Sequence, residues 1–594
     1  MANRLAVLAG AGLLAWSSAS VEARTRIEAA YEAGELDLHT ALLYQVLAVR
    51  DPGQLPSGYR EQRPHPVCGT PALVQALAAA TQGAPPGYVA KLAGIMARPV
   101  ADRSALSPAG RFRVHYDLAG AGAVDPRDAN GNKVPDYVDE VARTMDAVWA
   151  LQIDSLGFQP PPSDGVLGGG PEYDVYLTDL APGRAYGFTY PELAGKTTYS
   201  YLQLDNNYTD ASVYVQTKGL DALHVTAAHE FNHAIQFGYY QGNDGIWWQE
   251  ATATWMEEVA YPEVDDYLQY LDSFMRYPEK SLDSGSRYAA DLRIYGASLF
   301  AHYLHQRHHH AVVRQIWEAF GAAGNAALDH FDRVIGRYDA GGLAGAVAEF
   351  AIWNYFTGPR HVAGYYAEGQ KYPAVHLREV ELDFSSPKVA VEEVARVDHL
   401  GSTYLRLIPK LHAGGVQLEV EPRGPGRWRT HLLLAATDSV QILPLVQGVQ
   451  YVPSWDRYSE VVIVLTQVEL TGQGYEYSSM ITYDPDLIDV PPPLALRLGP
   501  VFPNPFRPAL HGASNWRYDL DVASQRTRFS IYSASGDLVR SVDLGARVPR
   551  REAVSWDGTN AAGSPVASGI YYGVLEADGR RATAKVALIR GADE

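Results

Sequence analysis

Residues 221–237 read DALHVTAAHEFNHAIQF, and this stretch decides how the rest of the chain is interpreted. Apolar residues recur at every fourth position from Leu223, which predicts one amphipathic helix over this range. On such a helix His229 and His233 lie one turn apart, so both imidazoles face the same direction. Two imidazoles in this arrangement can bind one Zn²⁺, and Glu230 is then placed to take a proton from water at that ion.

A second segment predicts the third ligand. Residues 247–258 read WWQEATATWMEE and open another helix after a glycine-rich turn. Glu250 follows His233 closely enough for the chain to turn and return, and two His ligands with one carboxylate leave a coordination position open, as hydrolytic zinc sites require. Gln249 and Thr254 are the expected hydrogen-bond partners of the ligating rings. The alternative is that Glu250 is a solvated carboxylate favoured by the helix dipole.

The two segments together resemble the gluzincin class of zinc metallopeptidases, with Ala251 where that class usually has Gly. Residues 106–360 also resemble a family of secreted bacterial proteins that are assigned as metalloproteases by motif. The shared features are an Asn-Gly-Asn loop, a Tyr-Asp-Val-Tyr strand and the Trp-Trp-x-Glu segment. The resemblance implies an α+β zincin-like catalytic domain, a Zn²⁺ cofactor and the hydrolysis of peptide bonds in protein or peptide substrates.

In that reaction Glu230 is the expected general base, and a further group must donate a hydrogen bond to the developing oxyanion. Tyr288 and Tyr295 are the candidates, and Tyr295 is preferred because a Tyr before a small residue at a helix start resembles the aminopeptidase arrangement. We expect an endopeptidase, since no obvious motif for binding a substrate α-amine is present. An aminopeptidase and a non-catalytic surface adhesin on the same scaffold are the alternatives, and the intact Glu230 argues against the adhesin.

A second metal site is expected in the loop that begins at residue 128. Oxygen-bearing side chains recur there at relative positions 1, 3, 5, 9 and 12, which are Asp128, Asn130, Asn132, Asp136 and Asp139. Ca²⁺ prefers six to eight such oxygens, and the segment resembles the Asp-rich loops of thrombospondin type 3 repeats. The alternative is an Asn-Gly turn that caps the following helix.

Cys68 is the only cysteine of the chain and lies in the segment PVCGTP at 66–71. An odd cysteine in an exported protein is a free thiol or an intermolecular link. The segment resembles the cysteine-switch motif of matrix metalloproteinases, but Val67 and Ala72 replace the Arg and Asp of that motif. The resemblance implies that Cys68 takes the open position on zinc and keeps a zymogen silent. The alternative is a small buried hydrophobe in a turn.

Composition limits the remaining possibilities. The chain has 594 residues and a net charge of −19, so it repels the phosphates of nucleic acids. After the N-terminus no apolar run reaches the ~18–20 residues that a membrane-spanning helix needs. A positive charge, an apolar run and small residues at positions 1–23 predict a secretory signal peptide, with a buried N-terminal helix as the alternative. We therefore expect a protein that is secreted or displayed at the surface of a bacterium.

Pattern shifts along the chain predict five segments. They are a signal peptide (1–23), a helical propeptide-like region (24–105), a metallopeptidase domain (106–370), a β-sandwich (371–490) and an Ig-like domain (495–594). The last segment contains FPNPF at 502–506, Trp-Asp-Gly at 556–558 and Ser-Gly-Ile-Tyr at 568–571, and resembles the Ig-like domain of flagellar hook-capping proteins. Related domains are sorting modules of the type IX secretion system, which implies an outer-membrane secretion machinery as partner. The alternative is a plain spacer.

Overall fold

The structure is a computed structural model, and it describes most of the chain from Thr25 to Arg590. The ranges outside the description are 1–24, 62–66, 82, 285–291, 383, 385–389, 410–411, 438, 446–447, 489–495, 521, 549 and 591–594. The predicted signal peptide therefore lies outside the described residues. The chain divides into two compact units between Leu487 and Ile488. Within the described ranges, no helix combines the length and the apolar character that crossing a bilayer requires.

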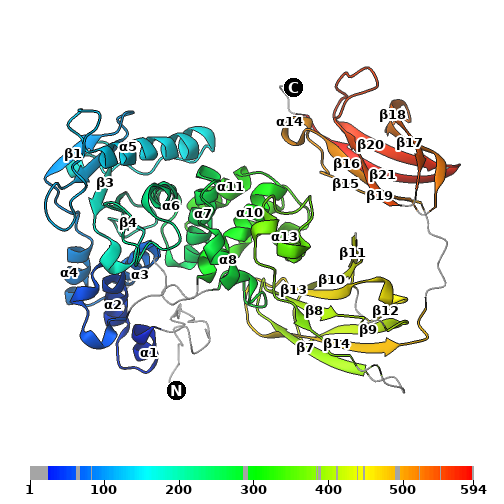
Figure 1. Cartoon of the computed structure of the whole chain (residues 1–594), viewed down its shortest axis with the longest axis horizontal. Helices are drawn as coiled ribbons and strands as arrows, with labels where there is room; N and C mark the ends of the chain where they lie inside the picture. The colour runs from blue at the N-terminus through cyan, green and yellow to red at the C-terminus, as the bar shows by residue number, and fades with distance from the viewer. Residues whose placement is uncertain are drawn as a thin grey trace, which may run out of the picture. The chain divides into compact units, whose positions relative to one another are not determined.

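The N-terminal region is helical, as predicted. Its helices are α1 (Arg26–Glu32), α2 (Leu38–Arg50), α3 (Thr70–Ala80) and α4 (Pro86–Ile95). α1 begins with a capping box, in which the Thr25 hydroxyl accepts from the Glu28 N–H and the Glu28 carboxylate accepts from the Thr25 N–H. The apolar faces of α2, α3 and α4 share one core with the neighbouring sheet, through residues such as Phe188. Figure 1 shows α2 and α3 beside strand β4 of that sheet.

The sheet has five strands in the order β1-β2-β3-β5-β4. The strands are β1 (Arg103–Leu106), β2 (Phe112–Tyr116), β3 (Tyr173–Thr178), β4 (Gly187–Pro191) and β5 (Ser200–Asp205). β2, β3 and β5 are parallel, whereas β1 and β4 run antiparallel at the two edges. The sheet begins at Arg103, slightly before the boundary expected at residue 106. β4 is therefore an edge strand, and its free side faces the N-terminal region.

Two helices pack on this sheet, α5 (Asp136–Trp149) and α6 (Gly219–Tyr239). α6 is the helix predicted from the apolar four-residue repeat, two residues longer at each end. Phe231 of that repeat lies between the rings of Phe112 and Trp149, at centroid distances of 5.3 and 5.6 Å. This packing fixes the rotation of α6, so that the opposite side of the helix presents its histidines.

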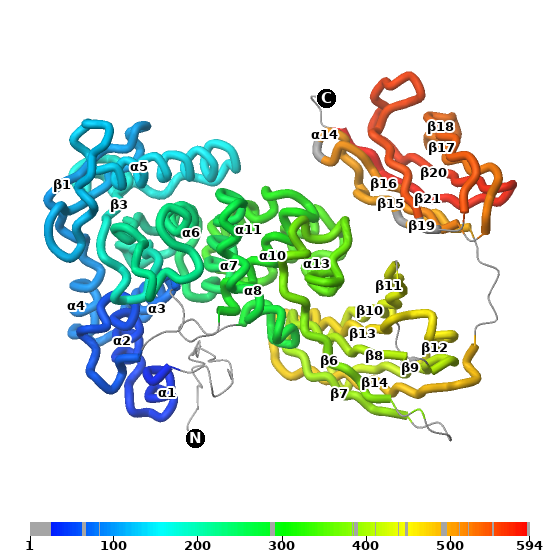
Figure 2. The backbone as a smooth tube through the Cα atoms, in the orientation of Figure 1, coloured from blue at the N-terminus to red at the C-terminus, as the bar shows by residue number. Residues whose placement is uncertain are grey.

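The remaining helices form a second layer beyond α6 (Figure 2). They are α7 (Ile246–Ala260), α8 (Leu268–Met275), α9 (Arg293–Gly296), α10 (Ser298–Arg307), α11 (Ala311–Ala323), α12 (Leu328–Ile335) and α13 (Gly342–Tyr355). α7 packs along α6 and against α10, with Trp248 and Trp255 fully buried. These two large rings fix the position of α7, so that Glu250 is held beside α6.

Two all-β sheets follow in the same compact unit, in the orders β11-β10-β13-β8-β6 and β12-β9-β14-β7. Their strands are β6 (Arg378–Glu379), β7 (Ala390–Val397), β8 (Ser402–Leu407), β9 (Gly415–Arg423), β10 (Trp428–Ala435), β11 (Val440–Pro444), β12 (Gly448–Val452), β13 (Glu460–Gln467) and β14 (Tyr475–Asp484). The Tyr355 hydroxyl at the end of α13 donates to Glu460, and the Tyr404 hydroxyl donates to the Ala351 carbonyl. These bonds connect the sheets to the helical layer.

The second compact unit is all-β apart from α14 (Pro508–His511), with sheets β15-β16-β19 and β18-β17-β20-β21. Its strands are β15 (Arg497–Phe502), β16 (Ser514–Leu520), β17 (Ser524–Ser533), β18 (Leu538–Arg547), β19 (Arg550–Trp556), β20 (Gly569–Ala577) and β21 (Arg580–Leu588). Asp578 and Gly579 join β20 to β21 with φ of 46° and 84°, which suits a type I′ hairpin turn. The expected succession of a mixed α and β part and then all-β sheets is confirmed.

Candidate metal centre

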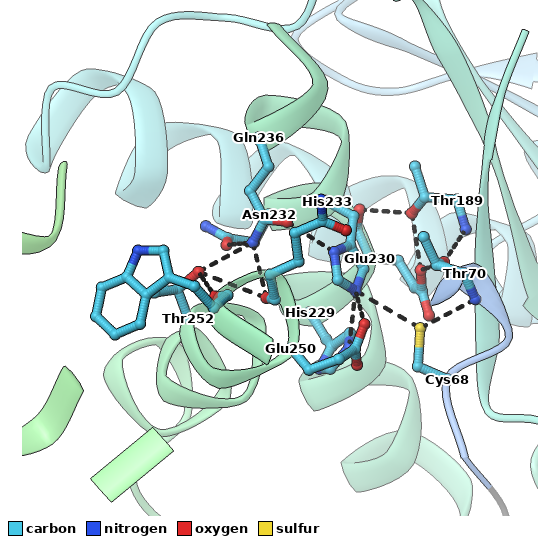
Figure 3. Close-up of polar contacts among 12 residues, drawn as sticks. Cys68, Thr70, Thr189, His229, Glu230, Asn232, His233, Gln236, Glu250 and Thr252 are labelled. Carbon is cyan, nitrogen blue, oxygen red and sulfur yellow. Dashed lines mark hydrogen bonds and ion pairs between the residues drawn. The ribbon is translucent and has the colours of Figure 1, made fainter. Parts of the chain in front are cut away.

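The histidines of α6 meet a carboxylate of α7 inside the domain (Figure 3). The Nε2 atoms of His229 and His233 are 3.1 Å apart. Glu250 Oε2 lies 3.4 Å from His229 Nε2, and Glu250 Oε1 lies 3.2 Å from His233 Nε2. All three side chains are buried. The structure therefore brings together the three residues that the sequence predicts as zinc ligands.

The N-terminal region adds a fourth donor to this group. The Cys68 sulfur lies 3.6 Å from His233 Nε2 and accepts a hydrogen bond from the Thr70 N–H at 3.4 Å. One ligand atom from each of Cys68, His229, His233 and Glu250 lies within 4.8 Å of all the others. Figure 3 shows the sulfur and the Glu250 carboxylate beside each other, next to the two histidine rings.

These residues fit a tetrahedral zinc ion. With Zn–N and Zn–O near ~2.05 Å and Zn–S near ~2.3 Å, tetrahedral ligand atoms are ~3.3 Å apart for N and O pairs and ~3.6 Å apart for N and S pairs. The measured separations of 3.1, 3.2, 3.4 and 3.6 Å agree with these values. Two imidazoles, a carboxylate and a thiolate are also the donor types that zinc takes in proteins.

The charges of the centre give a second reason for a cation. Both carboxylate oxygens of Glu250 are buried and accept no hydrogen bond from the described residues. Burial opposes its ionisation, but the neighbouring imidazoles of His233 and His229 hold the pKa of Glu250 at about 2. Burial, and then the charges of Glu230 and Glu250, raise the pKa of the Cys68 thiol. The two imidazoles therefore supply the positive charge that this buried carboxylate needs, and a metal ion bound by the three side chains would supply it in their place.

The other ring nitrogens are fixed by residues that the sequence analysis missed. His229 Nδ1 lies 2.6 Å from Glu257 Oε1, and His233 Nδ1 lies 2.8 Å from Gln236 Oε1. Both rings thereby direct Nε2 to the centre. The spacing of these residues could have indicated them. Glu257 follows Glu250 by two helical turns and Gln236 follows His233 by one, so each shares a helix face with a predicted ligand.

Gln249 and Thr254, which the sequence analysis expected to hydrogen-bond to the histidine rings, do not do so. The Gln249 amide donates to the Gly242 carbonyl, on the far side of the turn before α7. The Thr254 hydroxyl is buried and makes no hydrogen bond to either imidazole. Gln249 lies on another face of α7, whereas Thr254 shares the face of Glu250 and Glu257 but makes no hydrogen bond with the described residues.

Glu230 lies beside the ligands and contacts β4. Its Oε2 atom is 2.7 Å from the Thr189 hydroxyl and accepts a hydrogen bond from the Thr70 hydroxyl at 3.0 Å. The helix approaches the strand closely, because a Cβ atom at Gly187 would lie 2.7 Å from Glu230 Cγ. Oε1 is buried without a hydrogen-bond partner among the described residues. The carboxylate is thus held at one oxygen and available at the other.

Tyr295 is placed at the edge of the centre. It lies on α9, with its ring centroid 6.4 Å from that of His229. It lines a small cavity together with Cys68, Glu230 and Tyr270. The structure therefore brings Tyr295 near the ligands, and its role as an oxyanion donor stays a prediction. Tyr288 lies outside the described residues.

The residues expected to bind calcium form a loop at the start of α5. Asp128 Oδ1 accepts from the N–H groups of Gly131 and Asn132, and its Oδ2 accepts from the N–H of Lys133. The side-chain amides of Asn130 and Asn132 both donate to Asp139 Oδ2 at 2.8 Å. The N–H of Ala129 and then the Arg127 guanidinium lower the pKa of Asp136. Asn130, Asn132 and Asp139 meet one another, whereas Asp128 and Asp136 bind other groups of the loop, and the binding of Ca²⁺ stays a prediction.

Two family descriptions match parts of the chain. Residues 112–352 match a family of unknown function (DUF6055), and this range includes α6 and α7 but not Cys68. Residues 509–580 match the FlgD Ig-like domain. The second match confirms the resemblance of the C-terminal segment to the Ig-like domain of flagellar hook-capping proteins. No curated protein matches the chain.

Several bacterial structures are similar to parts of the chain. FlgD from P. aeruginosa is 22% identical over 13% of this chain and 57% of its own, with a TM-score of 0.11. PorZ, an essential surface component of the type-IX secretion system of Porphyromonas gingivalis, is 16% identical over 27% of this chain and 22% of its own, with a TM-score of 0.13. Latent PorU from the same organism is 10% identical over 36% of this chain and 32% of its own, with a TM-score of 0.15. The chain spans little more than half of FlgD, and these TM-scores are too low to assign a shared fold.

Proposed function

We propose that the domain around α6 and α7 is a zinc-dependent endopeptidase of the zincin type. The observation that supports this most is the convergence of His229, His233 and Glu250, whose ligand atoms are separated by 3.1–3.4 Å. Glu230 lies next to these ligands on the same helix, with one carboxylate oxygen buried and unpartnered among the described residues. A purely structural zinc site has no need of such a base beside it.

The roles of the residues follow from their contacts. Zn²⁺, when bound by His229, His233 and Glu250, supplies a Lewis acid that polarises the scissile carbonyl and lowers the pKa of water. Glu230 takes a proton at Oε1 and returns it to the leaving amine. Thr189 holds the other oxygen of that carboxylate at 2.7 Å and so orients it. Tyr295 supplies the hydrogen-bond donor for the developing oxyanion.

The free side of β4 supports an extended peptide as substrate. An edge strand offers unpaired N–H and C=O groups to which another extended chain can add. Residues 67 and 69, on either side of Cys68, pair with residues 184–187 where β4 begins, which supports cleavage within a chain rather than at its end. An endopeptidase is therefore preferred to an aminopeptidase.

The cellular setting forms part of the same proposal. The FlgD Ig-like match at 509–580 supports a protein of the bacterial surface, secreted through its signal peptide and sorted by an outer-membrane machinery. Ca²⁺ bound at the loop of residues 128–139 stabilises the start of α5. Secretion is tested by fractionating cells that express the full chain or the chain truncated after residue 490.

The experiment on the centre measures zinc and activity separately. The full chain is purified and its zinc content determined, and casein hydrolysis is followed with and without a chelator. Glu230→Gln is expected to retain zinc and to lose at least ~10²-fold in rate. Glu250→Ala is expected to lose both. His224→Gln is the control, because His224 lies on α6 but contacts Glu140 and Tyr261 instead of the centre. A Glu230→Gln enzyme as active as the wild type contradicts the proposal.

A further inference from the structure

We propose that Cys68 is the fourth ligand of the metal centre and that residues 67–70 hold the enzyme latent. The inference rests on the proposed function, because it concerns the regulation of the same site. Cys68 is 8% exposed and forms no disulfide. Its sulfur adds a fourth donor atom within 4.8 Å of those of His229, His233 and Glu250, the number that a tetrahedral zinc site takes. The position that a substrate carbonyl and water require is then occupied by a side chain of the same protein.

A lone buried cysteine can also be an ordinary core residue. The groups around Cys68 distinguish that role from metal binding. The sulfur faces His233 Nε2 at 3.6 Å, and the unpartnered carboxylate of Glu250 is directed into the same space. An apolar side chain placed for packing alone would face apolar groups. Cys68 belongs to the apolar core, but its sulfur also lies near the ligand atoms of two imidazoles and a carboxylate.

The backbone around Cys68 occupies the edge of the sheet. The Val67 N–H donates to the Arg184 carbonyl at 3.2 Å, and the Tyr186 N–H donates to the Val67 carbonyl at 3.2 Å. The Gly69 N–H donates to the Gly187 carbonyl at 3.0 Å. The segment runs parallel to its partner, through the bridge between Val67 and Ala185. These bonds use the groups that an extended substrate needs, so the segment and a substrate exclude each other.

The same segment also contacts the catalytic base, at the oxygen that Thr189 holds. Thr70, the first residue of α3, is fully buried, and its hydroxyl donates to Glu230 Oε2 while accepting from the Thr189 N–H at 2.8 Å. α3 continues into the core that it shares with β4 and holds this hydroxyl in place. Consecutive residues therefore contact three features of the active site: Cys68 the metal position, residues 67–69 the edge of the sheet, and Thr70 the Oε2 atom of the base.

The docking is tight at Gly69. A Cβ atom at this position would lie 1.8 Å from Phe188 Cε1, well inside the closest approach of real atoms. Phe188 is fully buried on β4, so the ring cannot move aside at low cost. Gly69→Ala is therefore expected to displace the segment while leaving the thiol intact, which provides a second route to the same test.

Cobalt substitution tests the ligand without using catalysis. The full chain is loaded with Co²⁺ in place of zinc, and the near-ultraviolet charge-transfer absorption of a cobalt–thiolate bond is recorded. The wild type is expected to show this band, and Cys68→Ser and Cys68→Ala are expected to lack it with one Co²⁺ still bound. Because the chain has one cysteine, the band has only one source. Its absence from the wild type with metal bound overturns the inference, whether or not the protein is a peptidase.

Activity of the uncleaved chain tests latency. Cys68→Ser, Cys68→Ala and Gly69→Ala are expected to hydrolyse casein at least ~10-fold faster than the wild type, because a larger fraction of molecules is competent. Thr81→Ala is the control, since Thr81 lies just after α3 and is exposed. Equal rates in the wild type and all three variants contradict latency and leave the peptidase assignment intact. Activity in no form, with the cobalt band present, contradicts the peptidase assignment and leaves Cys68 as a ligand.

Discussion

The Nδ1 atom of His229 lies 2.6 Å from Oε1 of Glu257, so the glutamate sits behind the ring, on the side opposite the metal centre. This contact sets the ring orientation and holds the proton on Nδ1, which leaves Nε2 free to bind a metal. Glu250 and Glu257 lie two turns apart on α7. One helix face thus supplies both a ligand and the group that orients another ligand.

Glu257→Ala is expected to lower zinc affinity by ~10–100-fold, the usual effect of removing a carboxylate behind a ligating histidine. Affinity is measured by competition with a chelating dye on the full chain. Glu263→Ala is the control, because Glu263 lies just after α7 and is exposed. Wild-type affinity in the Glu257 variant means that the contact is irrelevant to metal binding.

Gly187→Ala is expected to destabilise the domain by ~1–3 kcal/mol and to lower activity, because the new methyl group overpacks the contact between β4 and α6. Its Cβ would lie 2.7 Å from Thr226 Cγ2 as well as from Glu230 Cγ. Gly94→Ala is the control, since a Cβ at Gly94 on α4 meets nothing within 4 Å. Urea unfolding and zinc content are measured together. An unchanged unfolding midpoint for the Gly187 variant would show that the strand can move away.

His302 on α10 is expected to make the fold sensitive to acid. Burial, helped by the charge of His305, lowers the pKa of His302 to about 3. Between pH ~6.5 and that value the unfolded chain binds a proton that the folded chain does not, so stability falls by up to ~1.4 kcal/mol per pH unit on acidification. Urea unfolding at pH 7.5 and 5.5 is expected to show a smaller loss for His302→Leu than for the wild type.

His399 is expected to affect the pH dependence of stability in the opposite direction to His302, which the same experiment measures. Burial opposes its charging, but the hydrogen bond and charge of Asp283 raise the pKa of His399 overall. Its contribution is therefore present at low pH and lost as the pH rises through the folded pKa. His399→Gln is expected to increase the loss of stability on acidification. Parallel behaviour of the two variants would show that neither histidine controls the response.

Calcium is expected to stabilise the start of α5 if the loop binds it. Addition of ten times the dissociation constant raises the unfolding free energy by ~1.4 kcal/mol, which is seen as a higher melting temperature. Asp128→Ala removes three backbone hydrogen bonds from the loop and should abolish the response. Asp537→Ala, in a Ser-rich turn of the C-terminal unit, is the control. A calcium response that survives in the Asp128 variant places the ion elsewhere.

Local spacing accounts for the part of the centre that the sequence predicts. His229, Glu230 and His233 belong to one helix, whose periodicity fixes their directions before any tertiary contact forms. Glu250 is also accessible to prediction, because a short turn between two helices limits where it can lie. The FlgD-like segment is recognisable because its turns and its Trp-Asp-Gly run are local features.

Contacts between residues of different helices and strands are harder to predict from the sequence. Thr189 and Gly187 reach Glu230 only through the register and position of β4, an edge strand whose sequence gives no sign of its neighbour. Gln249 was the wrong choice because a residue next to a ligand in sequence points to another helix face. Thr254 shares the face of Glu250, but its buried hydroxyl makes no hydrogen bond to either imidazole. Glu257 shares the correct face, but whether it meets His229 depends on how α6 and α7 cross.

The bonds between residues 67–69 and β4 are intramolecular, and this determines how they respond to concentration. A segment tethered to its own site competes at an effective concentration on the order of millimolar, whatever the dilution of the protein. A single cut in the connection between α4 and β1, where Val100 is 94% exposed, turns this tethered contact into an ordinary bimolecular equilibrium. Dilution after such a cut then favours the open site, so under the proposed function a cleaved molecule is expected to gain activity as it spreads into a larger volume.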